Sequence, residues 1–305
     1  QEVVIRPMPP THYIKVAVNK FEKNYPNAPF STEAYYSEKI TENNRFIMHN
    51  EAVFKTYYPA YQDTISNQNQ LFLYRNEKKV HKVEFMSDKI KKEKEKERKK
   101  ASKKGLEDDE SMIDVKELFG GPGRILGIGG IDNKDPFLDS TSFKKFHYSF
   151  NEKSTPDMMV ISYKSKKFID NVKHNGNIFI DMQTDAIVAI ESHGIINMSL
   201  AIKSILFIMG IRIDKSNIIR KEKYRQINDR WYPENIQLAV DLTITKKNMF
   251  QKNEHSDFGI NWVYSVNKFE LDNPVPIALE KRFNSETEFE TQVFNDNGLS
   301  WSEIN

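Results

Sequence analysis

The residues best placed by type and spacing to bind a catalytic metal are His81 and Glu84, which form the one H-x-x-E motif of this chain. The motif lies in the alternating segment VHKVEF, which is typical of a strand, and on a strand positions i and i+3 point to opposite faces. The helical zinc motif H-E-x-x-H is absent. The other histidines are scattered along the sequence: His12, His49, His147, His174, His193 and His255. We therefore predict no metal site and no cofactor.

Residues that could act as a nucleophile are equally hard to find. The pattern G-x-S-x-G is absent, and Ser142 and Lys145 have the Ser-x-x-Lys spacing but lie in a polar loop. The absence of cysteine excludes thiol catalysis and disulfide bonds. The glycine-rich segment 120–130 lacks the known phosphate-binding spacings and is interpreted as a flexible loop. The sequence therefore predicts a protein that is not an enzyme, with a hydrolase as the minor alternative.

The most apolar stretch, residues 195–211, offers a different chemistry, the binding of an apolar ligand. It is roughly 17 residues long, near the lower limit for crossing a bilayer, and Lys203 near its middle would be costly there. We expect no transmembrane helix and interpret the stretch as a buried helix or strand–helix pair, with a lipid-facing or cavity helix as the alternative. The candidate cavity and lid residues are Ile195, Ile202, Ile205, Phe207 and Ile208, with Ile178 and Ile180 from a neighbouring strand.

Residues 88–110 are highly charged, with lysine and glutamate intermixed and almost no apolar residue. Because this segment cannot bury a face, we predict a long, solvated helical insertion that ends at Gly105. The alternative is a basic arm that touches phosphate, lipid headgroups or a protein. Its candidate partner contacts are Lys91, Lys92, Lys99 and Lys100. The net charge of +2 for the whole chain excludes nucleic-acid binding driven by bulk electrostatics.

Most of the remaining chain has the pattern of β-strands. Residues 30–40 and 44–58 are rich in aromatic and β-branched residues, with a turn at 42–44 between them. From residue 158 onward, short strands follow one another with only polar turns between them, which predicts an antiparallel meander. In one clear hairpin, residues 183–185 form the turn, and alternation places Ile178 and Ile180 on one face.

Two segments have helical patterns. Thr11 could cap the first helix, whose apolar residues share one face: Ile14, Ala17, Val18 and Phe21. Near the end of the chain, Ser285 and Glu288 have the spacing of a capping box. Phe289 and Val293 follow as an i, i+4 pair, so we predict a closing helix there.

Together these patterns predict an α+β protein that is mainly antiparallel β. We expect a curved sheet or open half-barrel with a few packing helices. A chain of 305 residues can hold one large domain or two modest ones. We assign residues 11–305 to a single β-rich domain and residues 1–10 to a linker from an upstream domain.

The hairpin GNIFIDMQTDAIVAIE and the segment RQINDRWYPENIQLAVDLTIT resemble the conserved region of Bacteroidota envelope proteins described as carboxypeptidase-like regulatory domain proteins. The pieces AYYSEKITENNRFIMHNEAVF, KNEHSDF and EKRFNSETEFETQVFNDN also match this pattern, and the opening EVVIR resembles the last strand of the β-sandwich that precedes it in that family. The strand–D-x-x-T–strand hairpin is also similar to lipoprotein carriers of the LolA/LolB type, which implies a concave antiparallel sheet with an apolar interior.

These resemblances imply a non-enzymatic protein of the cell envelope, periplasmic or associated with the outer membrane. In this hypothesis the concave sheet binds a lipid or another apolar ligand. The alternative is a structural or accessory subunit of an outer-membrane protein complex. Such a subunit would dock its partners through its sheet edges and the 88–110 helix.

Overall fold

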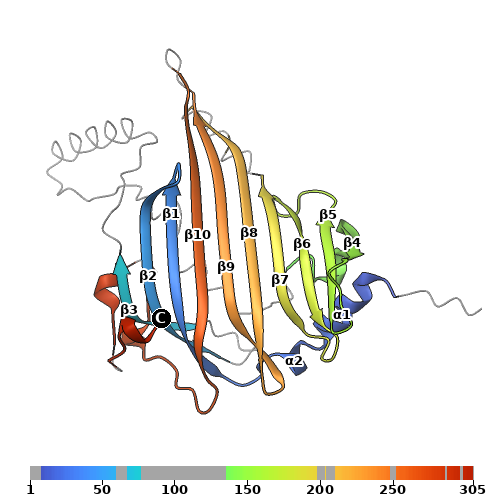
Figure 1. Ribbon diagram of the computed structural model, residues 1–305, viewed down its shortest axis with the longest axis horizontal. Coiled ribbons are helices and arrows are strands. Elements are labelled where there is room, and N and C mark those ends of the chain that lie inside the picture. The colour runs from blue at the N-terminus through green and yellow to red at the C-terminus, as the bar shows by residue number, and fades with distance from the viewer. Residues whose placement is uncertain are drawn as a thin grey trace, which may run out of the picture.

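The computed structural model describes residues 8–59, 67–76, 135–197, 203, 210–247, 252–285, 287–295 and 298–304. Within them, ten antiparallel strands form one open sheet in the order β3-β2-β1-β10-β9-β8-β7-β6-β5-β4 (Figure 1). The strands are β1 Phe30–Glu42, β2 Arg45–Tyr58, β3 Gln68–Asn76, β4 Phe146–Phe150, β5 Met158–Ser165, β6 Val172–Asp181, β7 Ile187–Ile196, β8 Ile211–Ile227, β9 Arg230–Lys246 and β10 Glu254–Glu270. The prediction of a mainly antiparallel, open sheet is confirmed.

The tight turns between neighbouring strands use asparagine and aspartate in the left-handed conformation. Asn43 and Asn44 have φ of 50° and 64° in the β1–β2 turn, and Asp170 and Asn171 have φ of 48° and 64° between β5 and β6. Two consecutive residues with positive φ match the twist of antiparallel strands, and these residue types tolerate that conformation. The turn predicted at residues 42–44 is therefore confirmed.

The order of the strands departs from a simple meander at one place. The first strand, β1, pairs with the last, β10, with Tyr36 opposite Tyr264 and Ile40 opposite Ile260. The unit β1–β3 is thereby joined to β10–β4 as a single sheet.

One face of the sheet, here called the inner face, carries both large hydrophobic cores. The first core lies on β1, β2, β9 and β10 and includes Phe54, Ile260 and the fully buried Trp262. Phe283 and Phe289, from the segment after β10, pack against it. The indole of Trp262 is paired within this core, since its Nε1 donates to Oε1 of the buried Glu38 at 2.9 Å.

The second core lies between two short helices and strands β4–β7. Helix α1 (Pro10–Asn19) and helix α2 (Phe21–Asn24) bury Ile14, Ala17 and Phe21, as the helical pattern predicts. Ile178 and Ile180 on β6 share this core, so the prediction that they lie on one face is confirmed. Thr11 is not the cap of α1. The helix begins with Pro10 after an extended Pro9, because proline is already set in a helical φ at the first position.

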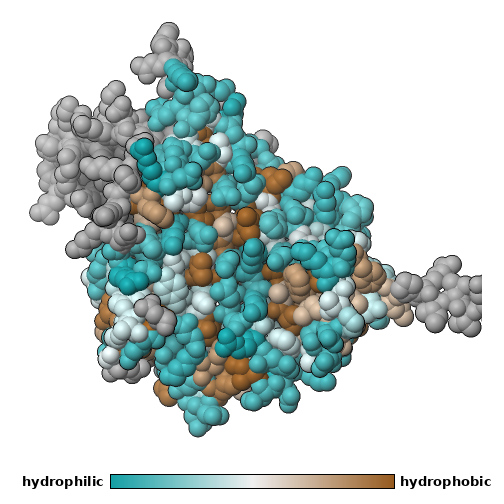
Figure 2. All heavy atoms as spheres, viewed as in Figure 1, coloured by the Kyte–Doolittle hydropathy of each residue, from teal (hydrophilic) through white to brown (hydrophobic). Residues whose placement is uncertain are grey.

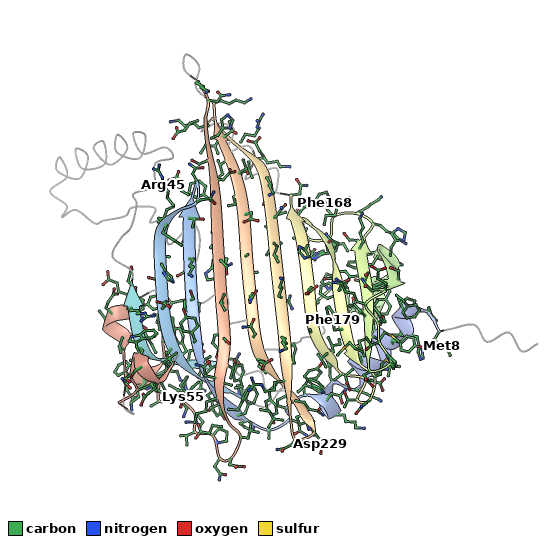
Figure 3. The ribbon with its side chains drawn as sticks, viewed as in Figure 1. Met8, Arg45, Lys55, Phe168, Phe179 and Asp229 are labelled. Carbon is green, nitrogen blue, oxygen red and sulfur yellow. The ribbon has the colours of Figure 1, made fainter. Side chains whose placement is uncertain are left out.

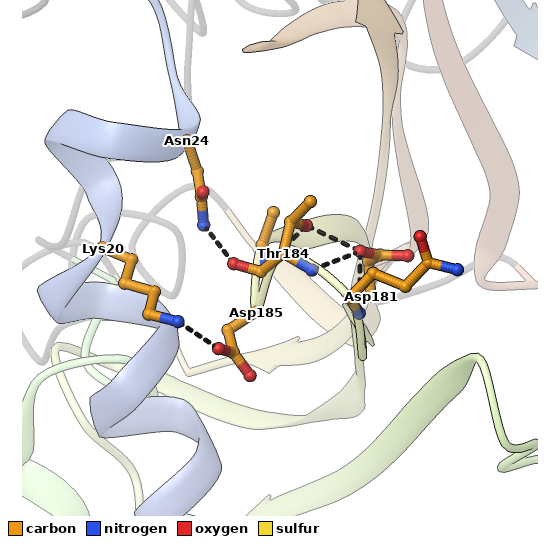
Figure 4. Close-up of polar contacts among 7 residues, drawn as sticks. Lys20, Asn24, Asp181, Thr184 and Asp185 are labelled. Atoms are coloured by element: carbon orange, nitrogen blue, oxygen red, sulfur yellow. Dashed lines mark hydrogen bonds and ion pairs between the residues drawn. The ribbon is translucent and has the colours of Figure 1, made fainter. Parts of the chain in front are cut away.

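Polar contacts join the helices to the β6–β7 turn (Figure 4). Lys20 forms an ion pair with Asp185, and Asn24 Nδ2 donates to the carbonyl oxygen of Thr184 at 3.0 Å. Within the turn, Asp181 Oδ1 accepts hydrogen bonds from the backbone N–H of Thr184 at 2.8 Å and from its hydroxyl at 2.6 Å. The D-x-x-T sequence therefore shapes the turn that receives the helices.

The predicted closing helix is wrong. The described residues of the segment form only short 3₁₀ turns, at Leu279–Lys281, Phe289–Gln292 and Trp301–Glu303, and the capping box is at Ser300 and Glu303 instead of Ser285 and Glu288. The backbone bonds to the edge strand β3: the N–H of Phe283 donates to the oxygen of Asn69 at 2.7 Å, and that of Phe294 to the oxygen of Leu71 at 2.8 Å. These sheet-like bonds compete with helix formation.

The charged segment 88–110, with Lys91, Lys92, Lys99 and Lys100, lies outside the described residues, so the predicted helical insertion stays a prediction. Among the described residues, no helix has the length and apolar character needed to cross a membrane.

Candidate functional site

The most distinctive local feature of the sheet is a step between β7 and β8. The last pair between these strands joins Ile195 to Asn217, and residues 211–216 of β8 continue past it. In the described part of the chain, those residues pair with β9 alone. Among the described residues, this part of β8 therefore has no strand partner on the β7 side, and we call the place the notch and define it by residues 195–197 and 210–217.

A β-bulge shapes the β8 side of the notch. Ile213 lies opposite Ile244 and Lys215 opposite Thr243, so Asp214 is an extra residue on β8. Asp214 accepts a hydrogen bond from Thr245 and forms an ion pair with Arg212. The hydrogen bond from Thr245, helped by Arg212, lowers the pKa of Asp214, so this carboxylate is ionised and its charge is already paired.

The notch holds a pocket of about 540 Å³. This size is within the range of ~300–1,000 Å³ typical of small-molecule sites. The apolar side chains that line it are isoleucines: Ile195, Ile196, Ile211 and Ile213. Four basic side chains also line it: Lys203, Arg212, Lys215 and Lys247. Among the described residues of this lining Asp214 is the one acidic residue, so their side chains combine an apolar surface with net positive charge.

Ser216 adds an unsatisfied polar group to the pocket. The residue is 5% exposed, and among the described residues its hydroxyl has no hydrogen-bond partner. A buried hydroxyl without a partner costs about 1–3 kcal/mol.

The candidate cavity residues are distributed over different places. Ile195, 50% exposed, lines the pocket. Ile178 and Ile180 are packed into the second core beneath α1, so they do not line the pocket. Ile202, Ile205, Phe207 and Ile208 lie outside the described residues.

A second polar cluster, formed by Asp135, Arg220, Glu222 and Tyr224, lies on the inner face. Arg220 binds Asp135 through both terminal nitrogens, at 3.0 and 2.8 Å, and Glu222 Oε1 through Nε at 2.6 Å. Burial, reinforced by Glu222, raises the pKa of Tyr224 well above its usual range, and its hydroxyl donates to Glu222 Oε2 at 3.0 Å. Both carboxylates are bonded to the same guanidinium, which indicates a structural ion cluster.

His174, half-buried on β6 near this cluster, makes stability depend on pH. Burial lowers the pKa of His174, an effect that Asp135 opposes. The unfolded chain therefore binds a proton more readily, and the fold loses stability as the pH falls below the unfolded value of about 6.5. We expect His174→Gln to flatten this loss in urea unfolding measured from neutral to mildly acidic pH. His193→Gln, at an exposed position on β7, is the control and should leave the pH dependence of the unfolding free energy unchanged. If His174→Gln loses as much stability at acidic pH as the wild type does, the prediction is contradicted.

No metal centre is formed by the residues the structure describes, where no group of three or more histidine, aspartate or glutamate side chains could hold an ion. His81 and Glu84 lie outside this part of the chain. The prediction that the protein is not an enzyme stays a prediction.

No family model, curated protein or solved structure matches this chain. The function proposed below therefore rests on the geometry of the notch.

Sequence reasoning missed most of this site. It selected Ile195 but not Ile213, Lys215 or Ser216. The segment IRIDKS, with isoleucines alternating with charged residues, carried a detectable signal of a strand with one apolar and one charged face. Its position beyond the end of β7 depends on strand pairing, which no local pattern reveals.

Proposed function

We propose that this protein is a non-enzymatic protein of the cell envelope that binds the apolar chain of an anionic amphiphile, such as a fatty acid, in the notch. The observation that carries this proposal is the pocket of about 540 Å³, in which isoleucines meet basic residues. Burying a methylene group contributes about 0.8 kcal/mol, so the isoleucine walls supply affinity. Lys203, Arg212 and Lys215 supply the preference for a negative headgroup.

The open antiparallel sheet is compatible with a half-barrel carrier, which is the finer architecture we propose. The two cores fill much of the inner face with side chains from α1, α2 and the C-terminal segment. For that reason, we place the ligand at the notch instead of the centre of the inner face.

The test is fatty-acid binding by notch variants. We expect Ile213→Asp to weaken the binding of a fluorescent long-chain fatty acid at least about tenfold, because it places a negative charge beside the apolar chain and the carboxylate. Ile213 is half-buried and belongs to neither hydrophobic core, so the fold should tolerate the change. Ile195→Asp, at a half-exposed position, should act in the same direction.

Ile219→Asp is the matched control, because Ile219 is a half-buried isoleucine on the same strand that does not line the pocket. Equal losses of affinity in Ile213→Asp and Ile219→Asp would contradict a site in the notch. A wild-type protein that binds no fatty acid, or binds the corresponding alcohol equally well, would contradict the anionic amphiphile.

An accessory subunit that docks through its sheet edges needs free backbone groups there. At the β3 edge, the backbone already accepts hydrogen bonds from the N–H groups of Phe283 and Phe294, so the structure gives this hypothesis less support. Docking through residues 88–110 stays a hypothesis, since that segment lies outside the described residues.

A further inference from the structure

The two ends of the sheet carry opposite charge. At the upper end in Figure 1, the described connections after β5, β7 and β9 contain Lys166, Lys167, Lys203 and Lys247. At the lower end, the connections after β4, β6 and β8 contain Asp157, Asp185 and Asp229, and Asp272 follows β10. Asp170 in the upper connections and Lys153 in the lower ones reduce this difference without reversing it, so the net charge of +2 conceals a separation of charge along the strands.

The upper end also exposes large apolar side chains. Phe46, beside the β1–β2 turn, is 45% exposed, and Phe168, next to Lys166 and Lys167, is 47% exposed. Figure 3 shows Arg45 and Phe168 at this end and Asp229 at the other. In the view of Figure 2, the upper end is mostly hydrophilic with a few hydrophobic residues.

Exposed apolar side chains also occur at the lower end, where Phe150 is 44% exposed, but there the nearest connection carries Glu152 and Asp157 against a single lysine, Lys153. An exposed aromatic beside a connection of net positive charge, Phe168 with Lys166 and Lys167 against Asp170, therefore distinguishes the upper end. Aromatic rings favour the level of lipid headgroups, and lysines are attracted to anionic lipids.

We propose that the upper end of the sheet docks onto the surface of a bilayer rich in anionic lipid. The lysines supply the attraction, Phe46 and Phe168 enter the headgroup region, and repulsion of the acidic lower end fixes the orientation. The notch lies at the same end, so docking would bring its opening to the lipid surface. Docking does not depend on ligand binding in the notch.

The experiment measures binding of the full chain to vesicles by flotation. We expect binding to vesicles of phosphatidylcholine mixed with anionic phosphatidylglycerol, weak binding to phosphatidylcholine alone, and a decrease with added salt. Lys166→Glu/Lys167→Glu should weaken binding at least about tenfold, and Phe168→Ala should weaken it to a smaller extent. The matched control is Lys23→Glu/Lys153→Glu, which changes the net charge equally through exposed lysines near the lower end.

Equal losses in the two double variants would overturn the proposal, because only net charge would then matter. Absence of binding to the anionic vesicles would also overturn the proposal. That result is the one expected if the upper end binds an acidic protein instead of a membrane. Failure of vesicle docking can be distinguished from failure of fatty-acid binding, because the two are measured separately. Lys166 and Lys167 do not line the pocket, so their double variant should keep its affinity for the fatty acid.

Discussion

Replacing Arg220 with methionine is expected to lower the free energy of unfolding by about 3–5 kcal/mol, the usual cost of breaking a buried ion pair. Glu222 is 3% exposed, and in this variant its charge and that of Asp135 would lose the guanidinium that binds both. Burial by itself would lower the pKa of Arg220, but Glu222 and Asp135 more than offset this and raise it. The positive charge is therefore stabilised by the fold, and urea or thermal unfolding would measure its loss.

Arg225→Met is the matched control, because Arg225 is an exposed arginine on the same strand that pairs with Glu234. Exposed ion pairs contribute about 0–1 kcal/mol, so this variant should unfold nearly as the wild type does. Adding Glu222→Gln to Arg220→Met should restore part of the stability by removing the unpaired charge. Equal losses in the two arginine variants would contradict a special role for the buried cluster.

Gly176→Ala is expected to destabilise the fold by about 3 kcal/mol or to prevent folding, through overpacking. A Cβ atom at Gly176 would lie 2.0 Å from the backbone oxygen of Glu191 on β7 and 2.7 Å from the hydroxyl oxygen of Tyr163 on β5. The backbone oxygen belongs to the sheet and cannot move without breaking strand pairing. The measurement is the yield of folded protein together with its unfolding midpoint.

Gly259→Ala on β10 provides the comparison. Its Cβ would meet only Thr41 Oγ1, at 2.9 Å, and that hydroxyl can rotate away, so we expect a loss below about 1 kcal/mol. If Gly176→Ala and Gly259→Ala lost similar stability, the prediction would be contradicted, because the close approach of β5 and β7 to Gly176 would then not explain the glycine there.

The local elements of this protein were predictable because their causes are local. Alternation identified the strands around Ile178 and Ile180, and the helical spacing of Ile14, Ala17 and Phe21 identified the face that α1 and α2 bury. The turn at Asn43 and Asn44 followed from residue types that tolerate positive φ.

Long-range interactions override a local signal in the C-terminal segment. The capping-box spacing of Ser285 and Glu288 favours an α-helix, but the described residues there form only a short 3₁₀ turn at Phe289–Gln292. The side chain of Gln292 bonds to the backbone of Asn284 in both directions, at 2.7 and 3.0 Å, and the segment bonds to β3. A pattern within a few residues cannot anticipate hydrogen bonds that a distant strand will offer.

The sequence by itself identified most of the strands, the apolar face of β6 and the turns at residues 42–44 and 183–185, because each depends on neighbours a few residues apart; it missed β4 and the first half of β8. Only the tertiary structure decided that β1 pairs with β10 and that Arg220 forms an ion pair with Asp135. It also decided that β8 extends past the end of β7 at the notch. The physical reason is that strand partners and their register are set by contacts between distant parts of the chain. The described walls of the pocket come together where β8 extends past the end of β7, and that depends on strand register.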